Sequence, residues 1–370
     1  MTLPLYLSAI QDPPARTAEG NAGLWFDKFC NTWRHEHGTW TMSASKNDTA
    51  GHGPKLQWLQ GLEGQVGNRA MLDEAASRLG RLVGAHEGRM AIFRTVTRFA
   101  TGLGRSHPIE NGFAWHPTLG TPYLPGSSLK GLVGAWAREG ADPKPCDDEV
   151  ARLLGDRGKV GSICFLDAIP VAPVRVEADV MTPHYGGWDP DDPPGDWRSP
   201  TPIHFLTTAA DARFLFGVLP WRPIAEKDVQ TTFTWMCEAL EWLGGGAKTA
   251  TGYGRFELDE PQTTSFKRRL EETSARQELL DAPGGRWLLE FRGKTELQIL
   301  EMVRVQLGNG GLTDPTERQA FAEAVPADMV VLWKVGKAKD KWTKLSSDKL
   351  KERARQVEQA RRGGDGGQPT

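Results

Sequence analysis

The hydrophobic pattern in the central part of the chain alternates between strand and helix periods. Residues 91–100 mix apolar side chains with β-favouring threonines and predict a strand. After Pro125 and Gly126, apolar residues recur at helical spacing, which predicts a helix capped by Ser127 or Ser128. The same reasoning predicts strands at residues 161–168, 174–180, 212–219 and 255–258, and a helix at residues 228–243.

This order of elements predicts an α+β fold for residues 89–258. A strand, a helix, two strands, a helix and a final strand give the βαββαβ arrangement, which is ferredoxin-like (RRM-like): an antiparallel sheet with two helices on one face. In RNA-recognition domains the other face of this sheet is free to hold RNA bases. We therefore expect an open sheet face in this part of the chain.

The flanking segments have mainly helical patterns. Residues 71–83, 265–280 and 347–361 each predict a helix. We expect residues 1–88 to form a mostly helical extension packed on the core, and residues 259–362 to form a helical C-terminal region. The tail, residues 363–370, is rich in glycine and is predicted to be disordered.

Composition limits the class of protein. The 370 residues are 25% charged and 39% hydrophobic, which is typical of a soluble globular chain. Residues 1–10 lack a basic leader followed by an apolar run, and no apolar stretch approaches the roughly 20 residues of a membrane helix. The 4 cysteines are scattered without a CxxC pair, which argues against structural zinc and disulfides. We expect a cytoplasmic protein without membrane contact.

Charge is distributed unevenly although the net charge is only −2. Residues 331–362 contain 11 Lys and Arg against 4 Asp and Glu, whereas residues 142–196 contain 12 acidic side chains against 5 basic ones. Opposed poles suit nucleic acid at one end and a basic neighbour at the other. The alternative is a solvated helix face and an acidic loop, including the 183–202 insertion. The 14 tryptophans favour subunit interfaces or base stacking at the surface.

The segment from Tyr123 to Gly131 brings several phosphate-binding groups to one helix start. Backbone N–H groups near Gly126, the hydroxyls of Ser127 and Ser128 and the charge of Lys130 lie together there. An ordinary capped helix is the alternative interpretation.

A second glycine-rich segment, residues 244–254, contains an Ala-Lys-Thr sequence that is similar to the end of a nucleotide-binding P-loop. Ala247 replaces the last P-loop glycine, and the order of elements is helix, loop and strand, which argues against ATP binding. Glycines in this number still allow close backbone approach to RNA phosphates or to the loop at Ser127. We expect Lys248 to line the same groove as Lys130. The other candidate residues of this loop are Gly246, Thr249, Gly252 and Gly254.

A third segment, residues 102–112, offers acid–base chemistry. His107 and His116 could act as base and acid in metal-independent RNA cleavage, with Lys130 stabilising the transition state. Alternatively, these side chains orient a folded hairpin by hydrogen bonds. The spacing of His35, His37 and His52 matches no common metal site, so we predict neither a metal nor a cofactor.

Together these motifs resemble the RAMP superfamily of CRISPR-associated proteins. The resemblance lies in Gly102-x-Gly104, residues 122–131 and residues 244–254. More narrowly, residues 21–28 and residues 105–112 resemble the sixth-subunit family of type III-B Cmr effector complexes, and the likeness extends over residues 20–258. The resemblance implies that residues 89–258 form a RAMP domain, in a multisubunit complex guided by crRNA.

The resemblance also implies that target cleavage belongs to another subunit, which uses an aspartate after its first strand. The corresponding loop here has Glu110 and no aspartate. We therefore predict a structural subunit without catalytic residues that contacts the crRNA backbone towards its 3′ end and supports target-RNA interference. Its predicted partners are crRNA, target RNA and other Cmr subunits. The predicted RNA-binding residues are Arg105, His107, Gly126, Ser127, Ser128, Lys130, Gly131, Gly246, Lys248, Thr249, Gly252 and Gly254.

Two alternatives remain open from the residues alone. The first is a metal-independent endoribonuclease of the same superfamily that processes precursor crRNA. The second is an adaptor that contacts only proteins through its tryptophans and its acidic insertion.

Overall fold

The computed structural model describes residues 15–17, 19–43, 53–183, 202–222, 226–281, 284–340 and 343–362. The chain forms two compact units, Met1–Lys267 and Arg268–Thr370, each with its own hydrophobic core. The predictions for His52, for most of the 183–202 insertion and for the tail lie outside the described residues.

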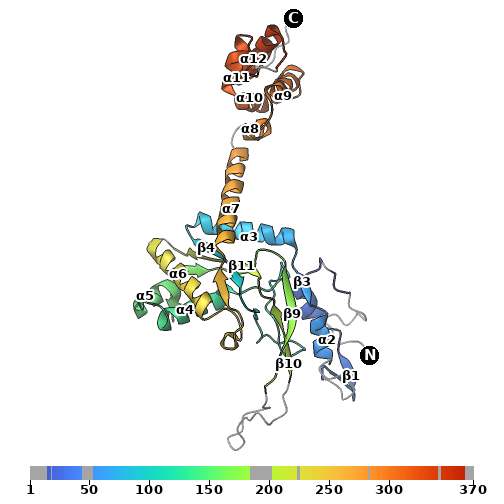
Figure 1. Cartoon of the computed structure of the whole chain (residues 1–370), viewed down its shortest axis with the longest axis vertical. Helices are drawn as coiled ribbons and strands as arrows, with labels where there is room; N and C mark the ends of the chain where they lie inside the picture. The colour runs from blue at the N-terminus through green and yellow to red at the C-terminus, as the bar shows by residue number, and fades with distance from the viewer. Residues whose placement is uncertain are drawn as a thin grey trace, which may run out of the picture. The chain divides into compact units, whose positions relative to one another are not determined.

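The first unit is built on a five-stranded antiparallel sheet (Figure 1). Strands β4 (Arg89–Thr95) and β11 (Arg213–Pro220) form its centre. The hydrogen-bonded order is β12-β4-β11-β7, with β8 also paired to β11. The outer strands are β12 (Phe256–Leu258), β7 (Ile163–Phe165) and β8 (Ile169–Pro170). The predicted strand at 91–100 ends at Thr95, beyond which Phe99 and Ala100 form single bridges to Thr208 and Ala247.

Two helices cover one face of this sheet. They are α4 (Gly126–Glu139) and α6 (Glu226–Trp242), which pack on each other and on the strands. Aromatic side chains fill the layer between sheet and helices: Phe216 meets Phe93 and Phe256 edge to face, with ring centroids 5.2 and 5.4 Å apart. Each fully buried ring of this kind stabilises the fold by roughly 2–3 kcal/mol.

The opposite face of the sheet is also covered, by helix α3 (Arg69–Ala85). Side chains alternate along a strand, so Gly217 of β11 faces away from α4 and α6. A Cβ on Gly217 would lie 3.1 Å from Cγ2 of Val83 in α3. Ile169 of the same sheet clusters with Leu72 of α3. The expectation of an open face is therefore wrong, because the apolar stripe of α3 is buried there.

A second sheet has the order β10-β9-β3 and is also antiparallel. Its strands are β3 (Gly64–Val66), β9 (Val174–Met181) and β10 (Ile203–Thr208), and helix α2 (Pro54–Gln60) packs against β9 and β10. The predicted strand at 174–180 thus exists but belongs to this separate sheet, because it pairs with β10, a strand that the sequence did not reveal.

The remaining elements of the first unit are short. The prediction of a mostly helical N-terminal segment is incomplete, because β3 and a hairpin of β1 (Arg34–Glu36) and β2 (Thr39–Thr41) accompany its helices. Helix α1 (Ala22–Lys28) is capped by Asn21. After α4 come helix α5 (Asp147–Leu154) and a hairpin of β5 (Gly155–Asp156) and β6 (Lys159–Val160).

Helix α7 (Glu260–Asp281) begins in the first unit, where Thr263 Oγ1 accepts a hydrogen bond of 2.9 Å from the Ile92 N–H. The second unit is helical. Its later elements are α8 (Gly285–Phe291), α9 (Glu296–Val303) with a π-helical turn (Arg304–Gly308), α10 (Pro315–Ala324), α11 (Ala327–Lys334) and α12 (Ser347–Arg361). In the described parts of the chain, every helix is too short or too polar to cross a membrane.

A buried carboxylate connects three segments of the second unit. Glu296, at the first position of α9, is 1% exposed. It accepts hydrogen bonds from Trp333 Nε1 at 2.7 Å, from the backbone N–H groups of Lys339 at 2.8 Å and Asp340 at 2.7 Å, and from Thr343 Oγ1 at 3.1 Å. Glu296 therefore holds Lys339, Asp340 and Thr343 against α9 and α11.

Candidate nucleic-acid interface

Helix α4 begins at Gly126, and neither serine caps it. The Gly126 N–H donates to Asp167 Oδ1 at 2.7 Å. A Cβ on Gly126 would overlap the carbonyl oxygen of Phe165, so only glycine lets the helix start this close to β7. The prediction that Ser127 or Ser128 caps the helix is wrong, because the helix starts earlier and a distant carboxylate takes the first N–H. A carboxylate also disfavours a phosphate at this point.

A cationic pocket of about 390 Å³ lies along the flank of α4. Lys130 and Arg138 from the helix and Lys159 from β6 line it, together with Ser127 and Gly131. Within the described residues, none of the three cations forms an ion pair; Arg138 Nη1 donates to the Gly134 carbonyl at 3.0 Å. Asp156 is the one carboxylate in the lining. The pocket is therefore suited to an anion.

Gly131 has no packing role among the residues that the structure describes. A Cβ there would meet no heavy atom within 4 Å, and the residue is exposed in the interior of a helix. Glycine in a helix interior costs about 1 kcal/mol relative to alanine. Close approach of another molecule's backbone is a physical reason for tolerating that cost.

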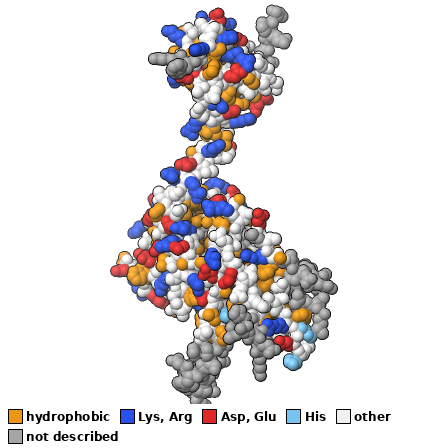
Figure 2. All heavy atoms as spheres, turned by 45° about the vertical axis from the view of Figure 1, so that its right-hand side comes forward, with side chains coloured by type: hydrophobic (Ala, Val, Ile, Leu, Met, Phe, Trp, Pro, Cys, Tyr) orange, Lys and Arg blue, Asp and Glu red, His pale blue; other side chains and the backbone are white. Residues whose placement is uncertain are grey.

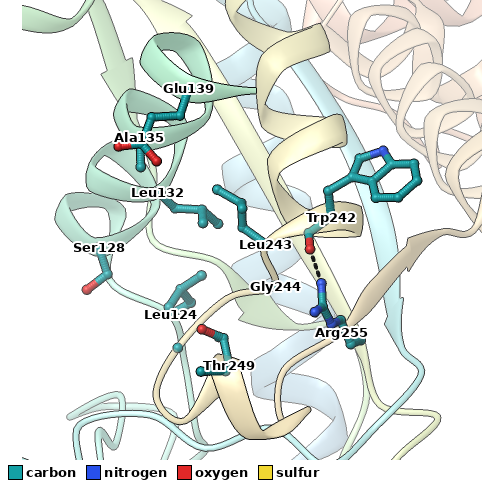
Figure 3. Close-up of a pocket in the computed structure, with 12 residues that line it drawn as sticks. Leu124, Ser128, Leu132, Ala135, Glu139, Trp242, Leu243, Gly244, Thr249 and Arg255 are labelled. Carbon is teal, nitrogen blue, oxygen red and sulfur yellow. Dashed lines mark hydrogen bonds between the residues drawn. The ribbon is translucent and has the colours of Figure 1, made fainter. Parts of the chain in front are cut away.

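The two turns singled out in the sequence do meet, at a separate groove of about 550 Å³ (Figure 3). Ser128 of α4 and Thr249 of the glycine loop line it. Arg255 donates through Nη1 to the Trp242 carbonyl at the end of α6. The rest of the lining is largely apolar and includes Leu124, Leu132 and Leu243.

Neither Lys130 nor Lys248 lines this groove, so the expectation of a shared groove for the two lysines is wrong. Lys248 adopts the left-handed conformation with φ of 60°. Its ammonium lies 5.0 Å from the ring centroid of Phe205 in β10 and donates to Met181 Sδ at 3.4 Å. The side chain therefore packs on the second sheet, whereas Lys130 lies at the flank pocket.

The glycines of the 244–254 loop serve contacts within the protein. The Ala247 N–H donates to the Ala100 carbonyl and the Gly254 N–H to the Arg98 carbonyl, both at 2.7 Å. A Cβ on Gly246 would overlap the Ala100 carbonyl oxygen, and one on Gly254 would overlap that of Gly245. Gly252, with φ of 94°, has open space around its Cβ position. The loop that contains the 3₁₀ turn (Thr249–Thr251) is thus fixed to Arg98 and Ala100, which follow β4.

His107 has an orienting role. Its ring stacks on Phe26 with centroids 3.9 Å apart, Nε2 lies 3.0 Å from the Phe26 carbonyl, and Nδ1 accepts from the Ile109 N–H at 3.3 Å. Burial lowers the pKa of His107, and the neutral ring with its proton on Nε2 satisfies both contacts. This is the role that the sequence offered as the alternative to acid–base catalysis.

His116, like His107, has a ring nitrogen engaged by a backbone N–H, whereas Arg105 is exposed. Nδ1 of His116 accepts from the Leu119 N–H at 3.3 Å, and burial lowers the pKa of this imidazole. Arg105 is exposed on the same loop. It lies close enough to oppose the rise that burial causes in the pKa of Asp27. Among the described residues, no group of three or more His, Cys, Asp or Glu is placed to hold a metal.

Two cationic lining residues of the flank pocket, Arg138 and Lys159, were missed from the sequence. Arg138 continues the helical series Lys130, Gly131 and Gly134, which was an available signal. Lys159 lies within the acidic 142–196 segment and carried no signal of its own.

Part of the basic charge near the end of the chain is paired within the second unit. In the basic 331–362 segment, Lys334 pairs with Glu358 and Lys339 pairs with Asp328. On the face drawn in Figure 2, Lys and Arg side chains lie among Asp and Glu on each unit.

Comparison with known proteins gives consistent matches. The RAMP superfamily model matches residues 92–257. The CRISPR system Cmr subunit Cmr6 of Pyrococcus furiosus is 32% identical, over 44% of this chain and 66% of that relative. The corresponding subunit of Saccharolobus solfataricus is 27% identical, over 45% of this chain and 55% of the relative. The chain thus spans just under two thirds of the first relative's length and just over half of the second.

A chain in the cryo-EM structure of type III-B Cmr-beta bound to cognate target RNA is 23% identical, with a TM-score of 0.46 over 56% of this chain and 71% of that one. The family model ends within the first unit, and the helical second unit lies outside it. The resemblance predicted from the sequence motifs is confirmed: residues 92–257 match the RAMP superfamily, and the chain is similar to the Cmr6 subunits of two CRISPR systems.

Proposed function

We propose that this protein is a non-catalytic, RNA-binding structural subunit of a type III-B Cmr effector complex in the cytoplasm. It contacts the crRNA backbone towards its 3′ end, assembles with other Cmr subunits and supports target-RNA interference. Its RAMP domain is ferredoxin-like. The strand order β12-β4-β11-β7 supports this, because the fourth, first, third and second strands of a βαββαβ chain lie side by side in that order.

The observation that carries the proposal is the flank pocket of α4. Lys130, Arg138 and Lys159 present three exposed cations without ion pairs in the described residues, beside a helix surface left bare at Gly131. Cations of this kind neutralise phosphates without reading bases. A subunit that accepts many different guide sequences needs this type of contact. Ser127 adds a hydroxyl to the same surface.

The contacts of His107 favour a structural subunit over the endoribonuclease. Both ring nitrogens are occupied, one by the Ile109 N–H and the other by the Phe26 carbonyl. A general acid or base needs a nitrogen that reaches the substrate. The role of His107 that these contacts support is to orient its loop, and neither ring nitrogen is left for proton transfer to a substrate.

Lys130→Ala is expected to lower the salt dependence of RNA binding. Loss of one phosphate contact reduces the slope of log affinity against log salt by about one unit. The measurement is filter binding of full-length protein to guide-length single-stranded RNA at several salt concentrations. Lys339→Ala removes the same charge from the second unit, where Lys339 pairs with Asp328, and serves as the control. An unchanged slope for Lys130→Ala would exclude this lysine from the interface.

Gly131→Ala is expected to raise the stability of the protein and to lower its affinity for RNA. Alanine adds about 0.5–1 kcal/mol of helix stability, because nothing obstructs the new methyl group. The same methyl group occupies the surface where the RNA backbone lies, so affinity falls several-fold. Thermal unfolding and RNA titration of one preparation measure both effects. A stabilised variant with unchanged affinity would place the RNA elsewhere.

A further inference from the structure

A neighbouring pocket of about 580 Å³ adjoins the flank pocket at Lys159, which lines both. The second pocket adds Arg152, Arg222, Val160 and Asp148. The linings of the two pockets together contain five cations and two carboxylates, Asp148 and Asp156. One of the cations, Arg152, is paired with Asp228. A connected, mainly cationic surface thus runs from α4 over the β5–β6 hairpin.

An exposed tryptophan stands beside the second pocket. Trp221 directly precedes Arg222, is 67% exposed, and follows the last residue of β11. The Trp221 N–H donates to the Ser162 carbonyl at 2.8 Å, which holds the backbone at this residue. The side chain of the next residue is held as well, because Arg222 Nη2 donates to the Val160 carbonyl at 3.3 Å. The indole is therefore held on an anchored backbone while much of it faces solvent.

Exposure of a whole indole is unfavourable unless another group covers it. Aromatic rings beside cationic tracks bind single-stranded nucleic acid, since each base can stack on the ring while its phosphate meets a cation. Here Lys159 and Arg222 supply the cations next to Trp221. Lysine is depleted at the centres of protein interfaces, so Lys159 favours a nucleic-acid neighbour over a protein neighbour at this position.

We infer that Trp221 stacks on an unpaired base of the bound RNA, at the far end of the cationic surface that begins at Lys130. This inference rests on the proposed function and specifies the form of the ligand. The RNA is single-stranded along this surface, with one nucleobase turned towards the protein and the phosphates running over Lys159. Arg222 holds the phosphate next to that base.

The test compares Trp221→Ala, Trp221→Phe and Trp242→Ala in the full-length protein. Trp242 is 64% exposed and lies in the groove of Figure 3, outside both cationic pockets, so it is the matched control. With a single-stranded uridine 20-mer, Trp221→Ala is expected to lose about fivefold or more in affinity. Trp221→Phe should recover most of that loss. The salt slope should stay unchanged, because no cation is removed. A duplex of equal length should bind all variants alike.

The outcomes separate this inference from the proposed function. If the wild-type protein does not bind RNA, the proposed function fails. If it binds with a slope insensitive to Lys130→Ala, Lys130 is excluded from the interface, and the RNA path proposed here, which begins at Lys130, fails with it. If the Lys130 effect holds but Trp221→Ala binds as tightly as wild type, or no worse than Trp242→Ala, stacking at Trp221 is wrong. Loss of co-purifying Cmr subunits with unchanged RNA affinity would assign Trp221 to a protein interface and would also overturn the inference.

Discussion

Replacing Glu296 by alanine is expected to lower the free energy of unfolding of the second unit by about 3 kcal/mol or more. The substitution leaves the Trp333 indole N–H, two backbone N–H groups and the Thr343 hydroxyl without their acceptor, in a position that water does not reach. Each buried donor left unpaired costs about 1–3 kcal/mol. Glu296→Gln keeps one acceptor oxygen and should lie between alanine and wild type.

Hydrogen exchange is the suitable measurement for Glu296, because two units with separate cores need not unfold together. Faster exchange is expected in α9, in α11 and at Lys339 and Asp340, while the first unit stays protected. Glu290→Ala, at an exposed position of α8, is the control and should change stability by less than about 0.5 kcal/mol. Equal protection of these segments in Glu296→Ala and Glu290→Ala would show that Glu296 does not hold them together.

The same carboxylate gives the second unit a defined acid sensitivity. Burial raises the pKa of Glu296, but the hydrogen bonds from Asp340, Lys339, Trp333 and Thr343 outweigh burial and lower it overall. A group whose folded pKa is lowered stabilises the fold above its unfolded pKa. That stabilisation is lost as pH falls from the unfolded pKa through the folded one.

Gly254→Ala is expected to destabilise the first unit by about 2–3 kcal/mol, against about 1 kcal/mol for Gly252→Ala. Both glycines have positive φ, 68° at Gly254 and 94° at Gly252, so alanine is strained in the left-handed backbone conformation at either position. At Gly254 the new Cβ would also overlap the Gly245 carbonyl oxygen, whereas at Gly252 it meets open space. The comparison isolates the cost of the backbone contact.

Urea unfolding of the two glycine variants, followed by a probe within the first unit, measures this difference. Gly254→Ala should also expose the Arg98 carbonyl, which now accepts the Gly254 N–H at 2.7 Å. Faster exchange at residues 245–254 would accompany the loss of stability. Similar midpoints for both variants would show that the loop tolerates the overlap by moving.

Local sequence patterns predicted the bounds of the helices better than they predicted which surfaces the helices and strands pack against. The helix predicted at 347–361 matches α12, and α6 extends the 228–243 prediction by two residues at its start, because each has a periodic apolar face. The packing of α3 on the sheet could not be predicted, because the apolar stripe of a helix shows that one face is buried but not which surface buries it. Strand β10 was missed because residues 203–208 follow a segment rich in proline and glycine.

The candidate site was predicted in part for similar reasons. Ser128 and Thr249, from the two segments that the sequence singled out, line one groove. It could not show that Lys248 adopts φ of 60° and packs on Phe205. Nor could it show that Lys159 joins Lys130, because 29 positions separate them and only the packing of α5 and its following hairpin brings them together.

The hydrogen bond from Gly126 to Asp167 has a geometric consequence for any strand bound at α4. With the end of the helix closed to anions, a ligand has to lie lengthwise beside the cylinder. Lys130 and Arg138 are eight residues apart, or about 12 Å along the axis at 1.5 Å per residue. Their side chains would therefore meet different nucleotides, and the footprint of this helix on RNA would span more than one repeat of the sugar–phosphate chain.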